Sequence, residues 1–235
     1  MATRKTNRSS RGRGARGSAR RASAHGQQAA DQQRTVIAQQ AARLVLDQGI
    51  RDYGVAKRKA AERLGAVSAA LLPSNREVEQ AVLEHRRLFG GSAALDQLHE
   101  LRKGALEAMR FFSAYAPRLV GAVLSGAVSE HTPITLHLHT DTAEDVPRRL
   151  LDADMSFDTS DVHLRYLSDR TQRCPRHQFS VDGLDYEVLV LAVDAIREAP
   201  ASPVDGRPER RASLSEVEAL VAKPPEPPAD LPVAD

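Results

Sequence analysis

The sequence predicts an α+β protein in which a helical N-terminal half packs on a small mixed β-sheet of four or five strands. Two observations lead to this: apolar residues recur at helical spacing over residues 33–115, and strand-like alternation follows Pro117. The 41% of hydrophobic residues among 235 suffices for a core if they are concentrated in the middle of the chain. We therefore expect a disordered basic arm at 1–32, a helical region at 33–116, an α+β core with a C-terminal helix at 117–222 and a disordered Pro-rich tail at 223–235.

The first segment is strongly basic. Residues 1–30 contain eight Arg and Lys residues and no acid, so the rest of the chain has a net charge of −6. The arm has no Ile, Leu, Val or aromatic residue, and cannot bury enough apolar surface to offset the entropy lost on ordering. Two interpretations stay open, a solubilising tail or an arm that binds nucleic acid by counterion release. The second would use Arg4, Arg11, Arg13, Arg16, Arg20 and Arg21.

The helical region carries recognisable start and stop signals. Asp52 is placed to cap a helix, and Ser74 and Glu77 form a capping box for the next one. Pro117 closes the last helix, because proline cannot continue the hydrogen-bonding pattern. We expect helices over residues 33–49, 52–65, 74–89 and 93–114.

The α+β core is predicted from a change of period. An apolar run, clean alternation of apolar and polar residues, and β-rich segments predict strands over residues 119–124, 134–139, 162–167, 177–181 and 186–191. Asp182 and Gly183 are a hairpin signal between the last two strands. Shorter helices are expected over residues 143–154 and 213–222, the second opened by a capping box.

Composition and motifs exclude several classes of function. No run of 18 apolar residues occurs, so we expect neither a membrane span nor a membrane partner. The single cysteine, Cys174, excludes an intramolecular disulfide framework and fits a reducing compartment, for which we predict the cytoplasm. The sequence has no P-loop, no dinucleotide-binding glycine motif and no hydrolase nucleophile elbow.

One segment resembles a known family. Residues 119–141, LVGAVLSGAVSEHTPITLHLHTD, have an apolar strand, a small-residue turn and a returning strand. This pattern resembles the core of the nucleotidyltransferase superfamily, in which the returning strand bears Asp-x-Asp and a later strand gives a third acid. The later strand here is LDYEVLVL, and Glu187 matches the third acid. The resemblance covers about residues 119–192. It implies a turn that approaches a triphosphate and carboxylates that hold Mg²⁺.

The sequence departs from that pattern at the metal-binding positions. Pro133 and Thr135 occupy the two Asp positions, and neither can supply a carboxylate. The turn is Ser125-Gly126, or Gly-Ala, rather than Gly-Ser. The resemblance therefore implies a degenerate metal site, with nucleotide or nucleic-acid binding and weak or no nucleotidyl transfer. If transfer remains, Glu187 is the catalytic candidate. The nucleotide-binding candidates are Ser125, Gly126, Thr135, His137 and Arg207.

Two alternatives belong to other classes of function. The first is a nucleic-acid-binding or regulatory module that is not an enzyme and works through the basic arm. The second is a metal-binding protein, because His137 and His139 share one face of a strand. Imidazole suits transition metals, although alternating histidines also occur on strand faces that bind nothing. The metal candidates are His137, His139, Asp141 and Glu187.

Overall fold

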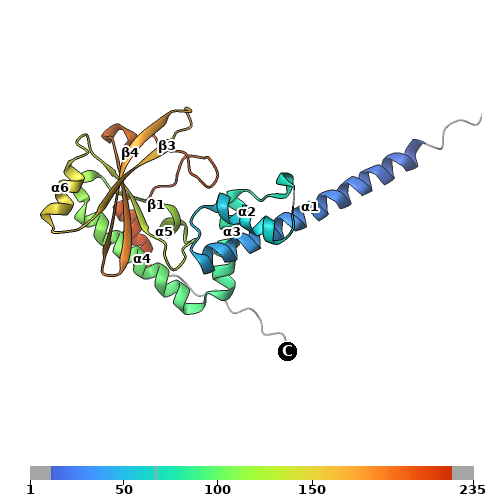
Figure 1. The fold of residues 1–235 in the computed structure, drawn as a ribbon, viewed down its shortest axis with the longest axis horizontal. Coiled ribbons are helices and arrows are strands. Elements are labelled where there is room, and N and C mark those ends of the chain that lie inside the picture. Colours follow the sequence, from blue (N-terminus) through green and yellow to red (C-terminus); the bar gives the residue numbers. More distant parts are fainter. Residues whose placement is uncertain (1–11, 67, 224–235) are drawn as a thin grey trace, which may run out of the picture.

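The computed structural model describes residues 12–66 and 68–223 of the chain. Five strands form one mixed sheet in the order β1-β2-β5-β4-β3 (Figure 1). Strands β2 and β5 are parallel, and the other neighbouring pairs are antiparallel. The strand bounds are β1 Arg118–Val120, β2 Ile134–His139, β3 Asp158–Arg165, β4 Thr171–Val181 and β5 Leu184–Leu191. The architecture is therefore α+β with a mixed sheet, as the sequence predicts.

Helices surround this sheet and also form a group of their own beside it. The α-helices are α1 Gly12–Gln48, α2 Tyr53–Arg63, α3 Asn75–Phe89, α4 Gly91–Phe111, α5 Gly121–Ser125, α6 Asp145–Asp152 and α7 Leu214–Ala222. Short 3₁₀ helices are η1 Ala69–Leu71, η2 Ser113–Tyr115 and η3 Val193–Ile196. Among the described residues, no helix combines the length and the apolar character needed to cross a membrane.

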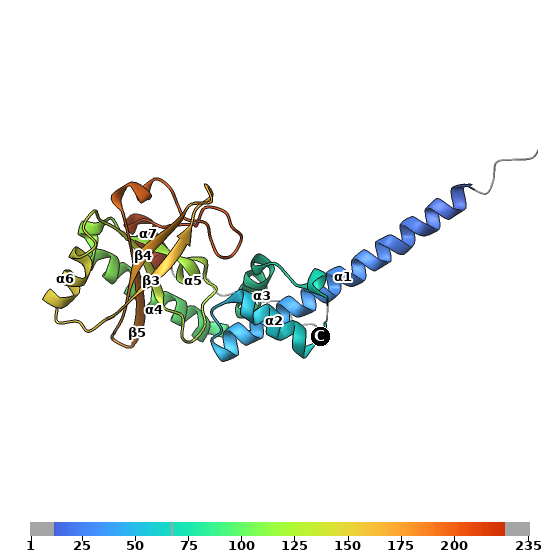
Figure 2. The same ribbon diagram turned by 45° about the horizontal axis from the view of Figure 1, so that its top comes forward.

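One face of the sheet carries the main core. Helices α4, α6 and α7 lie against this face (Figure 2). Met109 and Phe112 of α4 pack there with the alternate residues Leu136 of β2 and Val188 of β5, and all four side chains are buried. Burial of alternate strand residues against helices is the usual source of stability for such a layer. The residues between them on the same strands face the opposite side of the sheet.

Helices α1, α2 and α3 have a separate core. Ile37 and Leu44 of α1 pack against Ala60 of α2 and against Val78 and Val82 of α3, and all five are buried. The sequence predicts that the whole helical half packs on the sheet, but only α4 does so extensively. The small residues of α2 let it lie close to α1, so α1, α2 and α3 bury their apolar faces against one another and not against the sheet.

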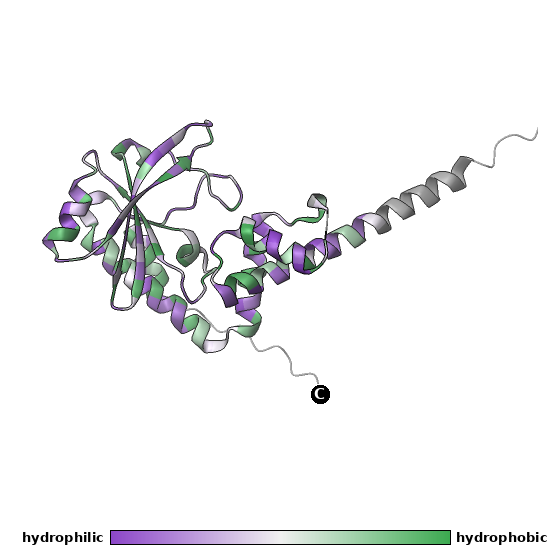
Figure 3. Cartoon of the chain, in the orientation of Figure 1, coloured by the Kyte–Doolittle hydropathy of each residue, from purple (hydrophilic) through white to green (hydrophobic). Residues whose placement is uncertain are grey.

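The far edge of the sheet is polar. Hydrophilic residues predominate along β3 (Figure 3), and its side chains are exposed or half-buried. Strand β3 begins four residues earlier than the sequence predicts, and β4 begins six residues earlier, at Thr171. Pro175 lies inside β4, at a point where β4 pairs with β3 but no longer with β5. A proline is tolerated there because it removes no hydrogen bond to a second neighbour.

Local sequence signals are otherwise confirmed. Both capping boxes form, at Ser74 with Glu77 and at Ser213 with Glu216. Asp182 and Gly183 both have positive φ, +52° and +77°, and join β4 to β5 as a tight hairpin turn.

Two predictions differ from the structure. The strand predicted over residues 119–124 ends at Val120, because Gly121 takes φ +69° and starts the short helix α5. Residues 12–32, predicted to be disordered, belong to α1, since Ala, Arg and Gln are good helix formers and continue a helix packed farther along. The rest of the predicted arm, residues 1–11, and the tail residues 224–235 lie outside the described residues.

Candidate functional site

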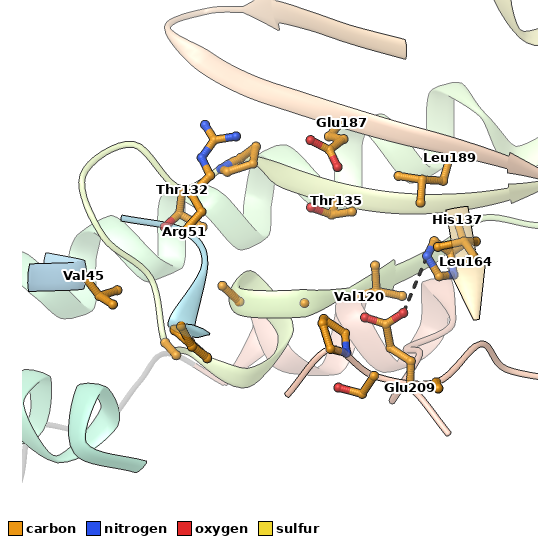
Figure 4. A pocket seen from close by; sticks show the side chains of 18 of the residues that line it. Val45, Arg51, Val120, Thr132, Thr135, His137, Leu164, Glu187, Leu189 and Glu209 are labelled. Atoms are coloured by element: carbon orange, nitrogen blue, oxygen red, sulfur yellow. Dashed lines mark ion pairs between the residues drawn. The ribbon is translucent and has the colours of Figure 1, made fainter. Parts of the chain in front are cut away.

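A cavity of about 560 Å³ lies on the face of the sheet opposite α4. We call it the sheet cavity. Its floor is β1, β2 and β5, and its walls come from the α1–α2 connection, from Leu164 of β3 and from the segment 201–209. Figure 4 shows Glu209, His137 and Leu164 at one end, Arg51 and Thr132 at the other, and Thr135 and Glu187 between them.

The middle of the cavity is a row of three side chains on neighbouring strands. Val120 of β1 pairs with Thr135 of β2, and Thr135 pairs with Glu187 of β5. Residues paired across a sheet point to the same face, so these three line the cavity together. The family resemblance implies that Glu187 lies on a strand near the one that bears Thr135, and in the parallel register of β2 and β5 the two residues are side by side.

Glu187 already has partners within the protein. Gln178 Nε2 donates a hydrogen bond of 3.3 Å to Glu187 Oε2. The same oxygen lies 3.7 Å from Arg176 Nη1, whose Nε donates to Ser160 Oγ at 2.9 Å. These contacts form a polar chain across β5, β4 and β3. They fix the carboxylate and partly neutralise it, which leaves it a poor cation ligand.

Glu209 is held over the sheet by a firmly anchored segment. Its backbone N–H donates to Pro200 O at 2.8 Å, and Leu119 and Ala212 exchange two backbone hydrogen bonds of 2.9 Å. Arg211 turns its guanidinium to the η3 carbonyls of Ala195 and Ile196, at 3.0 and 2.9 Å. The Arg211 guanidinium is therefore engaged by backbone carbonyl groups.

His137 lies beneath Glu209. Its side chain is 2% exposed, and its Nε2 is 3.7 Å from Glu209 Oε2, too long for a hydrogen bond. Burial, with smaller effects of His139 and Arg211, lowers the pKa of His137 to about 3. Burial also raises the pKa of Glu209 to about 7, although Arg211 acts in the opposite direction. At neutral pH the imidazole is uncharged, so the two groups are not an ion pair.

The four predicted metal ligands do not form a cluster. His139 Nδ1 is 3.0 Å from Ala116 O, and burial lowers the His139 pKa. Asp141, beyond the end of β2, accepts from Val193 N at 3.4 Å. Glu187 has the partners given above, and His137 faces Glu209. Within residues 12–66 and 68–223 no three His, Cys, Asp or Glu side chains lie close enough together to hold a metal ion. The four predicted ligands therefore do not form a shared metal site.

A second hollow, of about 750 Å³, adjoins the sheet cavity. We call it the loop groove. The two share Arg51, Gly121, Ala122 and Glu209 among their lining residues. Four arginines line the loop groove together with four carboxylates, and its lining includes Arg51, Arg76, Arg207, Arg210, Asp52, Glu79, Asp205 and Glu209. Its charges therefore balance formally.

The predicted nucleotide-binding residues are divided between the two hollows. Thr135 and His137 line the sheet cavity, whereas Ser125 and Arg207 line the loop groove. Gly126 lines neither: it ends α5 with φ +92°, and a Cβ there would lie 3.6 Å from the side chains of Leu83 and Leu98. The turn that leaves β1 is therefore Gly121-Ala122, because the positive φ of Gly121 is what stops the strand.

The predicted nucleic-acid-binding arginines fall largely outside this description. Arg4 and Arg11 lie outside the described residues. The other four, Arg13, Arg16, Arg20 and Arg21, belong to α1, where only the backbone is described.

Glu209 and Arg51 were not predicted from the sequence. Glu209 follows a turn-forming stretch and has the sequence character of a solvent-exposed loop residue. Arg51 donates to His131 O at 3.0 Å and so joins the α1–α2 connection to the loop before β2. Only the packing of distant segments brings both residues to the cavity, and no local sequence signal marks either.

Comparison with known proteins gives no relative. No family model matches the chain, and neither a curated protein nor a solved structure does.

Proposed function

We propose that the chain is a nucleotide-binding protein with a nucleotidyltransferase-like core, a degenerate metal site and weak or no nucleotidyl transfer. The observation that carries this proposal is the position of Thr135 beside Glu187 on parallel strands, in the floor of a cavity. A strand, a glycine turn and a returning strand precede them, as in the family pattern, with the short helix α5 between the turn and the returning strand.

The surroundings of the cavity suit a nucleotide that binds without a metal ion. A nucleotide needs apolar walls for its base and donors for its phosphates. Val120, Leu164 and Leu189 supply apolar surface. Gly121 leaves the backbone open, since no atom lies within 4 Å of where its Cβ would be. Arginines of the loop groove provide guanidinium forks, which match phosphate oxygens.

Nucleotide binding is expected to raise the melting temperature of the full chain whether or not a metal ion is present. A ligand at 100 times its dissociation constant stabilises a protein by about 2.7 kcal/mol, which is a shift of several degrees. The measurement is a thermal-shift panel with ATP, GTP, CTP and UTP, each in EDTA and in Mg²⁺ or Mn²⁺.

Two variants, one in the sheet cavity and one outside both hollows, make this experiment decisive. Thr135→Tyr fills the middle of the sheet cavity and is expected to abolish the shift. Thr171→Tyr, at an exposed strand position outside both hollows, is expected to retain it. No shift with any nucleotide would overturn the proposal, and a shift that requires metal would contradict its degenerate-site part.

A second function is favoured by the charge of the N-terminal residues. Eight basic residues and no acid occur in the first thirty positions, which suits non-specific binding to nucleic acid. Replacing Arg13, Arg16, Arg20 and Arg21 by Gln is expected to weaken binding to a DNA duplex. It should also flatten the plot of log affinity against log salt concentration by about three to four units of slope.

The control for this experiment replaces four arginines of the sheet region, namely Arg148, Arg149, Arg170 and Arg173. Equal losses in the two variants would contradict an arm-specific interaction. Retention of the full salt dependence without the four N-terminal arginines would contradict it as well.

A further inference from the structure

The end of the sheet cavity at Glu209 and His137 has hydrogen-bonding capacity that the protein does not use. Among the described residues, His137 Nδ1 is buried without a hydrogen-bond partner. Its Nε2 is too far from Glu209 for a hydrogen bond, and the 16%-exposed carboxyl group of Glu209 receives none from the described residues. Largely buried carboxyl groups are usually hydrogen-bonded, so an unpaired one that lines a cavity indicates a ligand's position.

We propose that Glu209 binds a planar group with two adjacent N–H donors, and that in the nucleotide of the proposed function this group is guanine. That the ligand is a nucleotide rests on the proposed function. That Glu209 contacts two adjacent N–H donors rests on the cavity alone.

The Glu209 carboxyl group accepts no hydrogen bond from the described residues. An ionised carboxylate in a largely buried position is costly unless donors or a cation face it. Arg211 is bound to the carbonyls of Ala195 and Ile196, and the Arg176 side chain belongs to the Glu187 contacts. Neutral His137 cannot neutralise the charge. Donors presented from the cavity would therefore satisfy the carboxylate and favour its ionised form.

The carboxylate of Glu209 also determines the shape of the ligand group that would bind it. Two oxygens of one carboxylate are best satisfied by two parallel N–H donors in the same plane. Leu164, Leu189 and Val120 line the cavity near Glu209 and provide apolar surface for a flat ring (Figure 4). Among the common nucleobases, guanine alone has this arrangement, with N1–H next to the exocyclic N2 amine. A guanidinium group has the same donor pair.

The lining of the cavity gives the direction of the ligand. With guanine at Glu209, the remainder of a nucleotide runs along β2 past Thr135 toward Gly121 and Arg51. Gly121 and Arg51 line the loop groove as well, together with Arg76. Base and phosphates then occupy one continuous surface.

The experiment measures the affinity of the full chain for GDP, IDP, XDP and ADP by calorimetry, with agmatine as a guanidinium ligand. Hypoxanthine in IDP lacks the N2 amine, and adenine lacks both donors. Wild-type protein is expected to bind GDP about ten-fold or more tightly than IDP or ADP. Glu209→Gln should reverse the preference, because an amide can accept from N1–H of xanthine and donate to its O2. That variant is expected to bind XDP more tightly than GDP.

Glu198→Gln is the matched control. Glu198 pairs with Arg170 outside both hollows, so this variant is expected to keep the wild-type preference for GDP. Equal affinities for all four nucleotides in wild type and in Glu209→Gln would overturn the guanine inference and leave the proposed function standing. Binding of agmatine that depends on Glu209, with no nucleotide binding, would retain the carboxylate contact, assign its partner to a guanidinium and overturn the proposed function.

Discussion

Replacing Glu209 by Gln is expected to stabilise the protein increasingly as the pH rises. The unfolding free energy of the variant minus that of wild type should increase by about 3 kcal/mol between pH 4 and pH 8. The pKa of this carboxyl group is about 7 in the folded chain against 4.5 in the unfolded chain. As the pH rises, Glu209 therefore keeps its proton to a higher pH in the folded chain than in the unfolded chain. The contribution of Glu209 to stability is present below pH 4.5, is lost between pH 4.5 and 7, and stays lost above pH 7. The amide does not titrate and removes this loss.

Urea unfolding of wild type and variant at a series of pH values measures the effect. The difference in unfolding free energy between them should be flat below pH 4.5 and grow with pH up to about 7. A Glu209→Gln difference that does not change with pH would contradict the burial argument. The experiment also shows whether the variant used to test ligand preference is folded.

Local features of this fold could be predicted because their causes lie within a few residues. The capping boxes at Ser74 and Ser213 need only a hydroxyl and a carboxylate three positions later. The Asp182-Gly183 turn needs two residues that tolerate positive φ. Strand β2 matches its predicted bounds because one of its faces is continuously apolar.

Features that depend on long-range packing could not be predicted in the same way. The apolar run after Pro117 suits a strand along its whole length, and only the backbone conformation of Gly121 ends β1 and starts α5. The helices α1–α3 could bury their apolar faces either on the sheet or on one another. The choice depends on how well α2, with its small buried residues, fits against α1.

Strand periodicity places Thr135 and His137 on one face, and the family resemblance suggests Glu187 on a later strand; in the structure all three line the sheet cavity. Glu209 contacts this face only because residues 208–212 fold back along Ala201 and β1, through single bridges at Pro208 and Ala212. Such bridges involve no repeating pattern, so nothing in the sequence separates Glu209 from an ordinary loop carboxylate.

Replacing His137 by Gln is expected to reduce the loss of stability in acid. The unfolding free energy of the variant minus that of wild type should be about 3 kcal/mol larger at pH 4 than at pH 8. Its folded pKa is about 3 against 6.5 in the unfolded chain, so the unfolded state takes up the proton first. The stability that depends on neutral His137 is fully present above pH 6.5 and is lost as the pH falls from 6.5 toward 3. Urea unfolding of wild type and His137→Gln at a series of pH values measures the effect.

The two substitutions are coupled because their windows overlap. Between pH 4.5 and 6.5, acidification stabilises the fold through Glu209 and destabilises it through His137, so in wild type the two slopes nearly cancel. The unfolding free energy of Glu209→Gln should therefore fall steeply below pH 6.5. That of His137→Gln should rise on acidification. In the double variant, the unfolding free energy should again change little with pH. His139 and His177, whose pKa values burial also lowers, add a residual acid sensitivity to all three. Single variants with parallel pH profiles would show that neither group titrates out of its ordinary range.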